Sequence, residues 1–458
     1  MTEHFDYLII GGGPAGYEAA AMAAENGYTT ALVERDQPGG TCLNRGCIPT
    51  KCFCTTAQAA ATFQHAAELG LNLPAGVVVT PDMPAIVQRK NAVVEQLRAG
   101  VEALLQQVEV ISGEARFVAP KTVEAAGRTI EADRVLIATG SEPAMLPIPG
   151  ADLTVTSTEV LDLEVLPDSM IIIGAGVIGM EFASIFCRLG VQVSVVEYAR
   201  EVLPQFDRDV ARRLRTALKQ QGVDIHTQAE VKSIEAAEGD RRRVCFAERG
   251  KDLMLEAEMV LMAVGRKAVI PAGAAEVGYA IGSRGFEVNG AMLTNIAGAW
   301  AVGDCNGRCQ LAHAATAQAR VALGENVDLS VIPSAVFTIP ECAMVGLTGE
   351  QCEQLRSAAE AEERPVPTYV EGKAFFRANG KACAMAETDG IVKVILDAET
   401  ALIVGCHICG PHAADLIAEA ALAMSARLTA SELISTVHAH PTLSEALTAA
   451  ITQAIMRI

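Results

Sequence analysis

The chain has 458 residues, of which half are apolar and 4% aromatic, and its formal net charge is −19 at pH 7. This length predicts several domains, and the composition predicts large aliphatic cores rather than disorder. The acidic balance argues against nucleic-acid binding and against binding to anionic membrane surfaces.

Targeting signals are also missing from the sequence. No apolar run approaches the ~20 residues that span a bilayer, and the first residues lack the basic and apolar regions of a signal peptide. We therefore expect a cytoplasmic protein without membrane segments. The 13 cysteines are then expected to be mostly reduced and buried, and a disulfide pair among them is expected to be catalytic rather than structural.

One pattern occurs twice along the chain. The first copy has a short apolar run, GGGPAG at Gly11–Gly16, an Ala-rich helix, and a second apolar run that ends at Glu34. The second copy has GAGVIG at Gly174–Gly179 and an apolar run that ends at Glu197. The first glycine precedes the acid by 23 residues in both copies (34 − 11 and 197 − 174). Equal spacing in two copies predicts two dinucleotide-binding Rossmann units.

Each position of the repeat has a physical role. The first glycine allows a tight turn, the second lets backbone N–H groups approach a pyrophosphate, and the third lets the helix pack closely on the strand. The acid accepts ribose hydroxyls. Glu197 would repel a 2′-phosphate, and Tyr198 and Ala199 follow it where an NADP site favours Arg, so the second copy favours NAD.

The remaining elements complete the predicted organisation. VLIATGS (135–141) and AWAVGDC (299–305) are expected to be buried strands that end in glycine turns. IVKVIL and ALIVGCHI, joined around Asp397–Thr400, predict an antiparallel hairpin, and HAADLIAEAALAMSA predicts a helix. These features predict a separate α+β domain over residues 331–458.

Cys42 and Cys47, in GGTCLNRGCIPTK, raise the question of a metal site, a structural bridge or a redox centre. On a regular helix such residues lie too far apart to bridge, so a disulfide requires an irregular turn, which Gly46 and Pro49 favour. A zinc site would show a CxxC knuckle and a second ligand pair, and so short a bridge would add little stability. A redox pair remains as the hypothesis, provided that an electron carrier lies nearby.

The same stretch resembles the redox-active segment of the flavin-dependent pyridine nucleotide–disulfide oxidoreductases. The first repeat is similar to their FAD fingerprint, ATGS and VGDC to their later FAD motifs, the second repeat to their nicotinamide site, and HAHPTLSE (438–445) to their catalytic-base motif. These motifs extend from Asp6 to about Leu447.

The resemblance implies an α/β fold with two Rossmann-like domains and a C-terminal α+β dimerisation domain. The expected ranges are 1–145 for FAD binding, 146–268 for NAD binding, 269–330 for a return to the FAD domain, and 331–458 for dimerisation. The implied FAD and NAD contacts are Gly11, Gly13, Gly16, Glu34, Lys51, Thr139, Gly140, Asp304, His313, Gly174, Gly176, Gly179, Glu197 and Gly265.

The resemblance also implies catalytic roles. Cys47 would be the thiolate beside the flavin, and Cys42 would be the thiol that exchanges with substrate. Lys51, paired with Glu181, would lie at the reactive edge of the flavin.

The implied base is His440, oriented by Glu445 and acting on the disulfide of the other subunit of a homodimer. The bond from His440 to Pro441 would be cis. His has a pKa suited to deprotonating a thiol near neutral pH.

The substrate expectation rests on the second His of HAHPTLSE. His438 is typical of members that oxidise dihydrolipoamide to lipoamide with reduction of NAD⁺. No lipoyl-type domain precedes Asp6, so lipoamide is expected on another protein, in a 2-oxoacid dehydrogenase or glycine-cleavage system. Arg45 replaces a usual small apolar residue beside the substrate path, which leaves an NAD(P)H-dependent reductase of another low-molecular-weight disulfide as the alternative. A non-catalytic scaffold is a third hypothesis.

GRKAVI (265–270) and Gln318–Ala319 depart from the family pattern, which bears on substrate detail and cofactor affinity rather than on reaction class. Other candidates are interpreted as structural. Cys52 and Cys54 are expected to be helix cysteines, and Cys406 and Cys409 would project from opposite faces of a strand, so no metal site is expected. Structural or surface roles are expected for His4, His65, His226 and Glu341.

Overall fold

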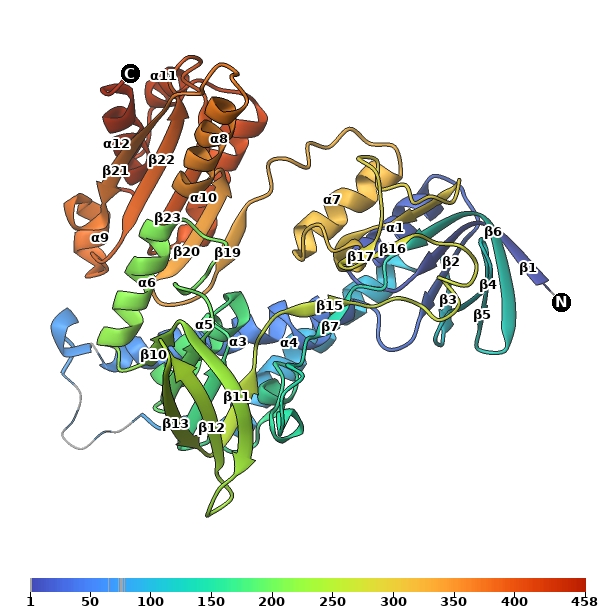
Figure 1. Cartoon of the computed structure of the whole chain (residues 1–458), viewed down its shortest axis with the longest axis horizontal. Coiled ribbons are helices and arrows are strands. Elements are labelled where there is room, and N and C mark those ends of the chain that lie inside the picture. Colours follow the sequence, from blue (N-terminus) through green and yellow to red (C-terminus); the bar gives the residue numbers. More distant parts are fainter. Residues whose placement is uncertain (1, 65, 73, 75–76, 78) are drawn as a thin grey trace.

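The computed structural model describes residues 2–64, 66–72, 74, 77 and 79–458. The prediction for His65 falls outside these residues. Figure 1 shows sheets in three regions of the molecule, with an extended segment after α7 leading into the C-terminal region.

The first sheet has the strand order β3-β2-β1-β6-β5-β4, and β18 also pairs with β6. β1 to β3 and β18 run parallel to their neighbours, whereas β5 pairs antiparallel with β4 and β6. All five residues of β2 are buried, which explains its unbroken TALVE sequence. The strands are β1 (Thr2–Ile10), β2 (Thr30–Glu34), β3 (Glu109–Ser112), β4 (Arg116–Ala119), β5 (Thr122–Ala125), β6 (Arg128–Ile137) and β18 (Ala299–Ala301).

Further helices and short strands belong to the parts of the chain before and after the second repeat. Two pieces of chain remote in sequence, α1 and α7, pack against each other, so residues after the second repeat return to the first sheet. The elements are α1 (Pro14–Glu25), α2 (Gly40–Arg45), α3 (Cys47–Gln64), η1 (Ala66–Leu69), α4 (Met83–Leu104), β7 (Ser141–Pro143), η2 (Ala151–Leu153), η3 (Glu159–Asp162), β15 (Arg266–Ala268), β16 (Ile281–Gly282), β17 (Gly285–Phe286), η4 (Gly303–Asn306) and α7 (Ala312–Ala322).

The second repeat forms a parallel sheet of order β10-β9-β8-β14, beside an antiparallel meander β11-β12-β13. Its helix α5 packs against α3, so the helix that follows the first repeat contacts both nucleotide folds. The elements are β8 (Ser169–Ile173), α5 (Val177–Arg188), β9 (Gln192–Glu197), α6 (Arg208–Gln220), β10 (Asp224–Thr227), β11 (Ala229–Ala236), β12 (Arg242–Glu248), β13 (Lys251–Ala257) and β14 (Met259–Met262).

The C-terminal region has an antiparallel sheet of order β19-β20-β23-β22-β21. The predicted hairpin is confirmed as β22 and β23, and the predicted helix as α10. The elements are β19 (Ser334–Val336), β20 (Glu341–Gly346), α8 (Gly349–Ala361), β21 (Tyr369–Phe375), η5 (Phe376–Ala378), α9 (Gly380–Met385), β22 (Ile391–Asp397), β23 (Ile403–Gly410), α10 (Ala413–Ser425), α11 (Ala430–Ser435) and α12 (Glu445–Ile455).

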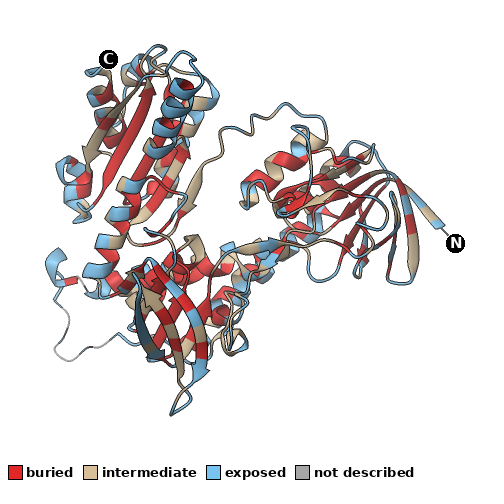
Figure 2. Ribbon diagram, viewed as in Figure 1, coloured by how far each residue is buried: buried red, intermediate tan, exposed pale blue. Residues whose placement is uncertain are grey.

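The three regions share buried contacts. Figure 2 shows buried residues concentrated in the strands of the first sheet and of the C-terminal sheet. One apolar core joins Phe53 of α3, Phe182 of α5, and Cys342 and Cys409 of the C-terminal sheet. None of the helices formed by the described residues is both long and apolar enough to cross a membrane.

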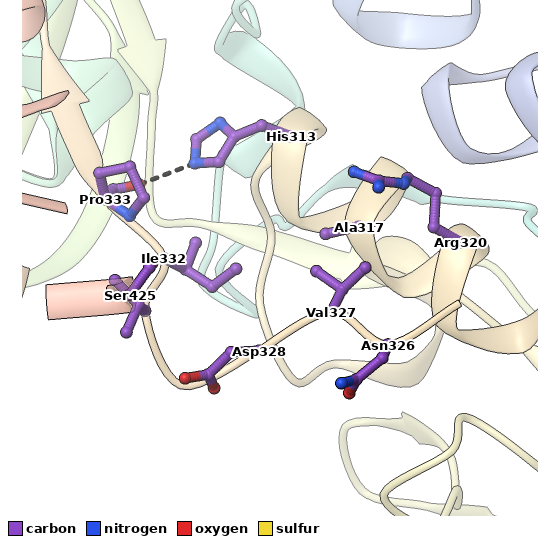
Figure 3. A pocket seen from close by; sticks show the side chains of 10 residues that line it. His313, Ala317, Arg320, Asn326, Val327, Asp328, Ile332, Pro333 and Ser425 are labelled. Atoms are coloured by element: carbon purple, nitrogen blue, oxygen red, sulfur yellow. Dashed lines mark hydrogen bonds between the residues drawn. The ribbon is translucent and has the colours of Figure 1, made fainter. Parts of the chain in front are cut away.

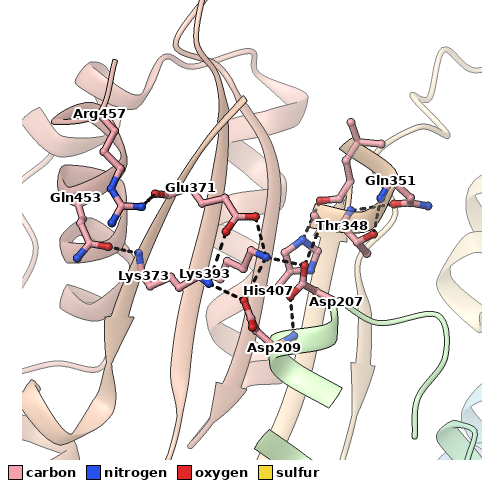
Figure 4. Close-up of polar contacts among 12 residues, drawn as sticks. Asp207, Asp209, Thr348, Gln351, Glu371, Lys373, Lys393, His407, Gln453 and Arg457 are labelled. Carbon is pink, nitrogen blue, oxygen red and sulfur yellow. Dashed lines mark hydrogen bonds and ion pairs between the residues drawn. The ribbon is translucent and has the colours of Figure 1, made fainter. Parts of the chain in front are cut away.

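A polar cluster also joins α6 to the C-terminal sheet (Figure 4). Lys393 Nζ on β22 lies 3.0 Å from Asp207 Oδ2 and 2.9 Å from Glu371 Oε1. Asp207 caps α6 and is fully buried, and the Lys393 side chain is 5% exposed. Burial alone would lower the pKa of Lys393, but the charge of Asp207 and the hydrogen bonds that Lys393 donates to Glu371 and Asp207 outweigh it and raise that pKa. The buried Lys393 ammonium, paired with the carboxylates of Asp207 and Glu371, thus holds the second nucleotide fold against the C-terminal sheet.

Candidate active site

The first glycine loop has a closed side and an open side. Gly11 has φ 101°, and a Cβ there would lie 2.4 Å from the Ala138 carbonyl oxygen. A Cβ on Gly16 would lie 1.8 Å from the Gly11 oxygen, so the helix packs on the strand as predicted. Gly13 has nothing within 4 Å of such a Cβ, and it begins α1 without a side-chain cap. Free N–H groups at an open helix start fit a pyrophosphate.

The second loop repeats this geometry. Gly174 has φ 102°, a Cβ on Gly179 would lie 2.0 Å from the Gly174 oxygen, and Gly176 is open. The N-cap residue has φ −72° in both loops, with ψ −175° in the first and −173° in the second. Both loops therefore have the form that a dinucleotide requires.

The two predicted acids also make matching contacts. Glu34 Oε2 accepts a hydrogen bond from Gly12 N at 2.5 Å, and Oε1 accepts one from Asp36 N at 2.8 Å. At the equivalent positions of the second copy, Glu197 Oε2 accepts a hydrogen bond from Ala175 N at 2.5 Å and Oε1 accepts one from Ala199 N at 2.6 Å. Burial raises the pKa of Glu34, while the Gly12 hydrogen bond opposes this effect. Each carboxylate is fixed at the carboxyl end of its strand, where a ribose would lie.

A cavity of about 2290 Å³ brings most of the predicted site together. Gly16 and Gly179 are absent from its lining, and each packs against the backbone of the first glycine of its own loop. His440 and Glu445 are also absent. The predicted residues that line the cavity are Gly11, Gly13, Glu34, Cys42, Cys47, Lys51, Thr139, Gly140, Gly174, Gly176, Glu181, Glu197, Gly265, Asp304 and His313.

The cysteine pair lies across a break between two helices. α2 ends at Arg45, Gly46 has φ −141° and ψ −109°, and α3 begins at Cys47. A Cβ on Gly46 would lie 2.9 Å from the Thr41 oxygen. Pro49 lies in the first turn of α3, where its missing N–H costs nothing. The irregular turn that a Cys42–Cys47 bridge requires is therefore confirmed.

The two thiols have different acidities. A hydrogen bond with Cys42 and the charge of Lys51 lower the pKa of Cys47 to about 7, against the effect of burial. The same hydrogen bond and burial raise the pKa of Cys42. Above about pH 7 the reduced pair is therefore a Cys47 thiolate beside a Cys42 thiol.

Lys51 lies one turn further along α3. Its Nζ donates to both carboxylate oxygens of Glu181, at 3.0 and 3.1 Å. The Glu181 side chain is 5% exposed, and its Oε1 also accepts from Phe337 N at 2.9 Å. The predicted Lys51–Glu181 pair is confirmed as a contact between two nucleotide folds.

The sequence analysis missed two further residues at the cavity, Ser141 and Arg266. Asp304 Oδ2 accepts from Ser141 Oγ at 2.5 Å, and Arg266 Nε donates to Ser141 Oγ at 2.7 Å. Burial raises the pKa of Asp304 and lowers that of Arg266. Arg266 belongs to GRKAVI, and its contact with a serine 125 residues earlier had no local signal.

Two predicted residues use their side chains to fasten the backbone. Thr139 Oγ1 donates to the Val269 oxygen at 2.6 Å. His313, in the first turn of α7, lies 2.7 Å from the Pro333 oxygen through Nε2, which therefore carries the proton. Figure 3 shows His313 beside a smaller cavity of about 500 Å³ between α7 and the segment that leads to β19. This contact ties the start of α7 to the segment that leads to β19.

The predicted base lies on an exposed loop. His440 Nδ1 is 2.9 Å from Glu445 Oε1, and Glu445 Oε2 accepts from Thr442 N at 2.9 Å. The His440 side chain is 78% exposed. The Thr442 hydrogen bond and then His440 lower the pKa of Glu445. The peptide bond between His440 and Pro441 is cis, as predicted.

His438 lies in the same loop with different partners. Its Nε2 is 2.6 Å from Glu419 Oε1, and its Nδ1 is 2.9 Å from the Thr436 oxygen. Both partners accept hydrogen bonds, and the bond to Glu419 raises the pKa of His438. His438 is therefore engaged with α10, whereas Nε2 of His440 points away from its Glu445 partner.

The unusual residues have structural partners. Arg45 forms an ion pair with Asp36, in the turn after β2, which neutralises its charge. Gln318 is buried and accepts from Gly303 N at 2.8 Å and from Asn306 Nδ2 at 2.7 Å. These contacts fasten Arg45 and Gln318 within the first nucleotide fold, and Arg45 also lines the cavity that holds Cys42 and Cys47.

The other candidates are also structural. Cys406 and Cys409 are buried on β23, and Cys52 and Cys54 lie on α3. Among the described residues, no group of three or more His, Cys, Asp and Glu could hold a metal ion. His4 pairs with Asp133, His226 lies between Asp224 and Glu248, and Glu341 accepts from Ala414 N.

Known protein families match both parts of the chain. Residues 5–319 match the pyridine nucleotide-disulphide oxidoreductase model, and residues 332–451 match the dimerisation domain of the same family. The dihydrolipoyl dehydrogenase of Chlamydia pneumoniae is 38% identical, covering 97% of this chain and 96% of that protein. That of Bacillus subtilis is 36% identical, covering 98% of both.

Solved structures give the same result. The HOCl-induced flavoprotein disulfide reductase RclA from Escherichia coli has a TM-score of 0.83 and 30% identity, covering 98% of this chain and 99% of that one. Its Cu(II) complex has a TM-score of 0.84 and 29% identity. The protein is an oxidoreductase that uses FAD and a pyridine nucleotide, and its dimerisation domain indicates a homodimer. The chain belongs to the pyridine nucleotide-disulphide oxidoreductase family.

Proposed function

We propose that the protein oxidises dihydrolipoamide to lipoamide and reduces NAD⁺, using Cys42, Cys47 and the His440–Glu445 dyad of the partner subunit. The observation that carries the proposal is that the pKa of Cys47 is lowered while that of Cys42 is raised. Both cysteines lie in one cavity with the Lys51–Glu181 pair and with both glycine loops. Relatives of nearly full-length similarity named dihydrolipoyl dehydrogenase support the substrate.

The exchange of disulfides begins with proton removal. His440 Nε2 takes a proton from one thiol of dihydrolipoamide, and Glu445 stabilises the imidazolium through Nδ1. The substrate thiolate attacks Cys42 Sγ of the Cys42–Cys47 disulfide, and Cys47 leaves as a thiolate that Lys51 stabilises. The second substrate thiol then attacks the substrate sulfur of the mixed disulfide, and its proton passes to the departing Cys42 sulfur. This step releases lipoamide and leaves Cys42 as a thiol.

The cofactors complete the electron path. When bound, FAD accepts the electron pair of the reduced cysteines and NAD⁺ receives it as hydride. Gly11, Gly13 and Glu34 would hold the first dinucleotide, and Gly174, Gly176 and Glu197 the second. The carboxylate of Glu197 would repel a 2′-phosphate, which favours NAD over NADP.

The first test is NADH formation by the purified FAD-loaded protein with free dihydrolipoamide, beside NADP⁺ and beside reduced glutathione. Turnover is expected only with dihydrolipoamide and NAD⁺. His440→Gln should lower the turnover by about 10²–10⁴-fold, as expected for loss of a general base. A protein that is reduced by NADH but does not turn over dihydrolipoamide would contradict the substrate.

The second candidate is reduction of another low-molecular-weight disulfide with NAD(P)H. The specific observation in its favour is the similarity to RclA, which is named as a flavoprotein disulfide reductase. Arg45, the residue that suggested this alternative in the sequence, forms an ion pair with Asp36. Steady-state rates with a panel of disulfides and NADH separate the two, because only the first candidate prefers lipoamide over every other member.

The remaining assignments are proposals of the same kind. A lipoyl-bearing protein of a 2-oxoacid dehydrogenase or glycine-cleavage system would supply the substrate. The cytoplasm is the predicted compartment. The predicted boundaries 1–145, 146–268, 269–330 and 331–458 remain our proposed division of the chain, supported by the return of β18 and α7 to the first sheet.

A further inference from the structure

The carboxylate of Glu181 is held from two sides. It lies on α5, and its side chain is 5% exposed. Lys51 of α3 donates to both oxygens, and Phe337 N donates to Oε1 at 2.9 Å. A buried carboxylate requires such compensation, and here it comes from the first nucleotide fold and from the C-terminal domain.

The side chain of Phe337 acts on the other member of this pair. Lys51 Nζ lies 4.1 Å from the centroid of the Phe337 ring. At this distance the negative face of the ring attracts the ammonium group. Phe337 therefore contacts the carboxylate through its backbone and the ammonium through its ring, and it also lines the large cavity.

The backbone around Phe337 is fixed by side chains of α3 and α5. Cys54 Sγ donates to the Phe337 oxygen at 3.4 Å. Two residues further on, Ile339 N donates to Ser184 Oγ at 3.0 Å. The segment that joins β19 to β20 is thus fastened where α3 and α5 pack together, so the ring has a defined position under Lys51.

We propose that Phe337 is a positioning residue that holds the Lys51 ammonium at the reactive cysteine pair, so that the C-terminal domain of each chain tunes its own redox centre. The inference rests on the proposed role of Cys47 and Lys51. It is separate from the contribution of His440, which comes from the partner subunit. The C-terminal domain of each chain would then act on two active sites: Phe337 on the site of its own chain, and His440 on the site of the partner subunit.

The test follows the Cys47 thiol directly. The reduced, FAD-loaded protein is alkylated with iodoacetamide over a range of pH, and Cys47 is quantified by peptide mass spectrometry. Phe337→Leu keeps the backbone N–H and removes the ring, so Lys51 keeps its ion pair with Glu181 but loses the aromatic face beneath its ammonium group. We expect the Cys47 midpoint to rise by about half a pH unit, which lowers alkylation below the midpoint by about threefold.

Matched variants separate positioning from packing. Phe337→Tyr keeps the ring face and should retain the wild-type midpoint, and Phe337→Met replaces Leu if that variant does not fold. In a Lys51→Met background, Phe337→Leu should cause no further shift. The proposal would be overturned if the Cys47 alkylation midpoint were unchanged in folded Phe337→Leu or Phe337→Met. It would also be overturned if Phe337→Leu shifted that midpoint equally in the Lys51→Met background. The readout needs no lipoamide, so failure of the proposed substrate would not affect it.

Discussion

At the scale of single residues, the cysteine pair shows how neighbours divide one chemistry between two thiols. Cys42 and Cys47 have the same intrinsic pKa, yet their mutual hydrogen bond and Lys51 place the negative charge on Cys47. The sequence predicted both roles by resemblance. It could not show Ser141 or Arg266, because their partners are more than a hundred residues away.

This asymmetry predicts a pH-dependent reactivity. The lowered pKa keeps Cys47 ionised above about pH 7, so its alkylation in the reduced protein should fall as pH decreases through about 7. Cys42 should react only at much higher pH. Mass spectrometry of iodoacetamide-treated protein measures both rates, with Cys47→Ser as the control for peptide assignment. Equal rates for the two cysteines at pH 7 would contradict the assigned charge.

At the scale of elements, the break between α2 and α3 determines whether the cysteines can meet. Gly46 ends one helix, and Cys47 begins the next. The same principle operates in the two glycine loops, where third-position glycines allow a helix to approach its strand. Such local geometry is set by contiguous residues, which is why the sequence predicted it correctly.

The break makes Gly46 sensitive to substitution. In Gly46→Ala, the added Cβ would lie 2.9 Å from the Thr41 oxygen, so the α2–α3 turn must shift. We expect a loss of about 1–3 kcal/mol in the free energy of unfolding, together with slower formation of the Cys42–Cys47 disulfide. Denaturant unfolding and thiol titration measure these effects. Gly100→Ala on α4, where the Cβ meets nothing within 4 Å, is the matched control.

At the scale of the whole molecule, polar contacts at domain boundaries place the nucleotide folds relative to the C-terminal sheet. Lys393 reaches Asp207 of α6, and Glu181 joins Lys51 to Phe337. These residues lie far apart in sequence. Their contacts arise only when three domains pack together, so no local pattern predicts them.

Removal of Lys393 should destabilise this arrangement. Lys393→Met would leave Asp207 and Glu371 without their shared buried cation, and we expect a loss of about 3–5 kcal/mol in the free energy of unfolding. Lys373→Met, at a side chain that is 33% exposed, is the control and should cost far less. Urea unfolding monitored by circular dichroism measures both, and similar losses would contradict the role of burial.

The dimer makes a further prediction about the base. Cys47→Ala and His440→Ala homodimers should each be inactive, but co-expressed chains should recover activity. Each heterodimer has one intact site of two, so we expect about a quarter of wild-type turnover in the randomly paired mixture and about half in purified heterodimers if His440 acts on the partner subunit. Dihydrolipoamide oxidation by separately tagged, co-purified chains measures this recovery. No recovery in verified heterodimers would assign His440 to its own chain.

The sequence by itself determined the repeated glycine loops, the acids that end β2 and β9, the cysteine pair and the C-terminal hairpin. Each depends on residues close together along the chain, where backbone geometry is local. Tertiary structure alone decided that Lys393 pairs with Asp207, that Arg266 joins Ser141, and that Phe337 lies beneath Lys51. Those contacts depend on how separate elements and domains pack, and spacing along the sequence carries no record of that packing.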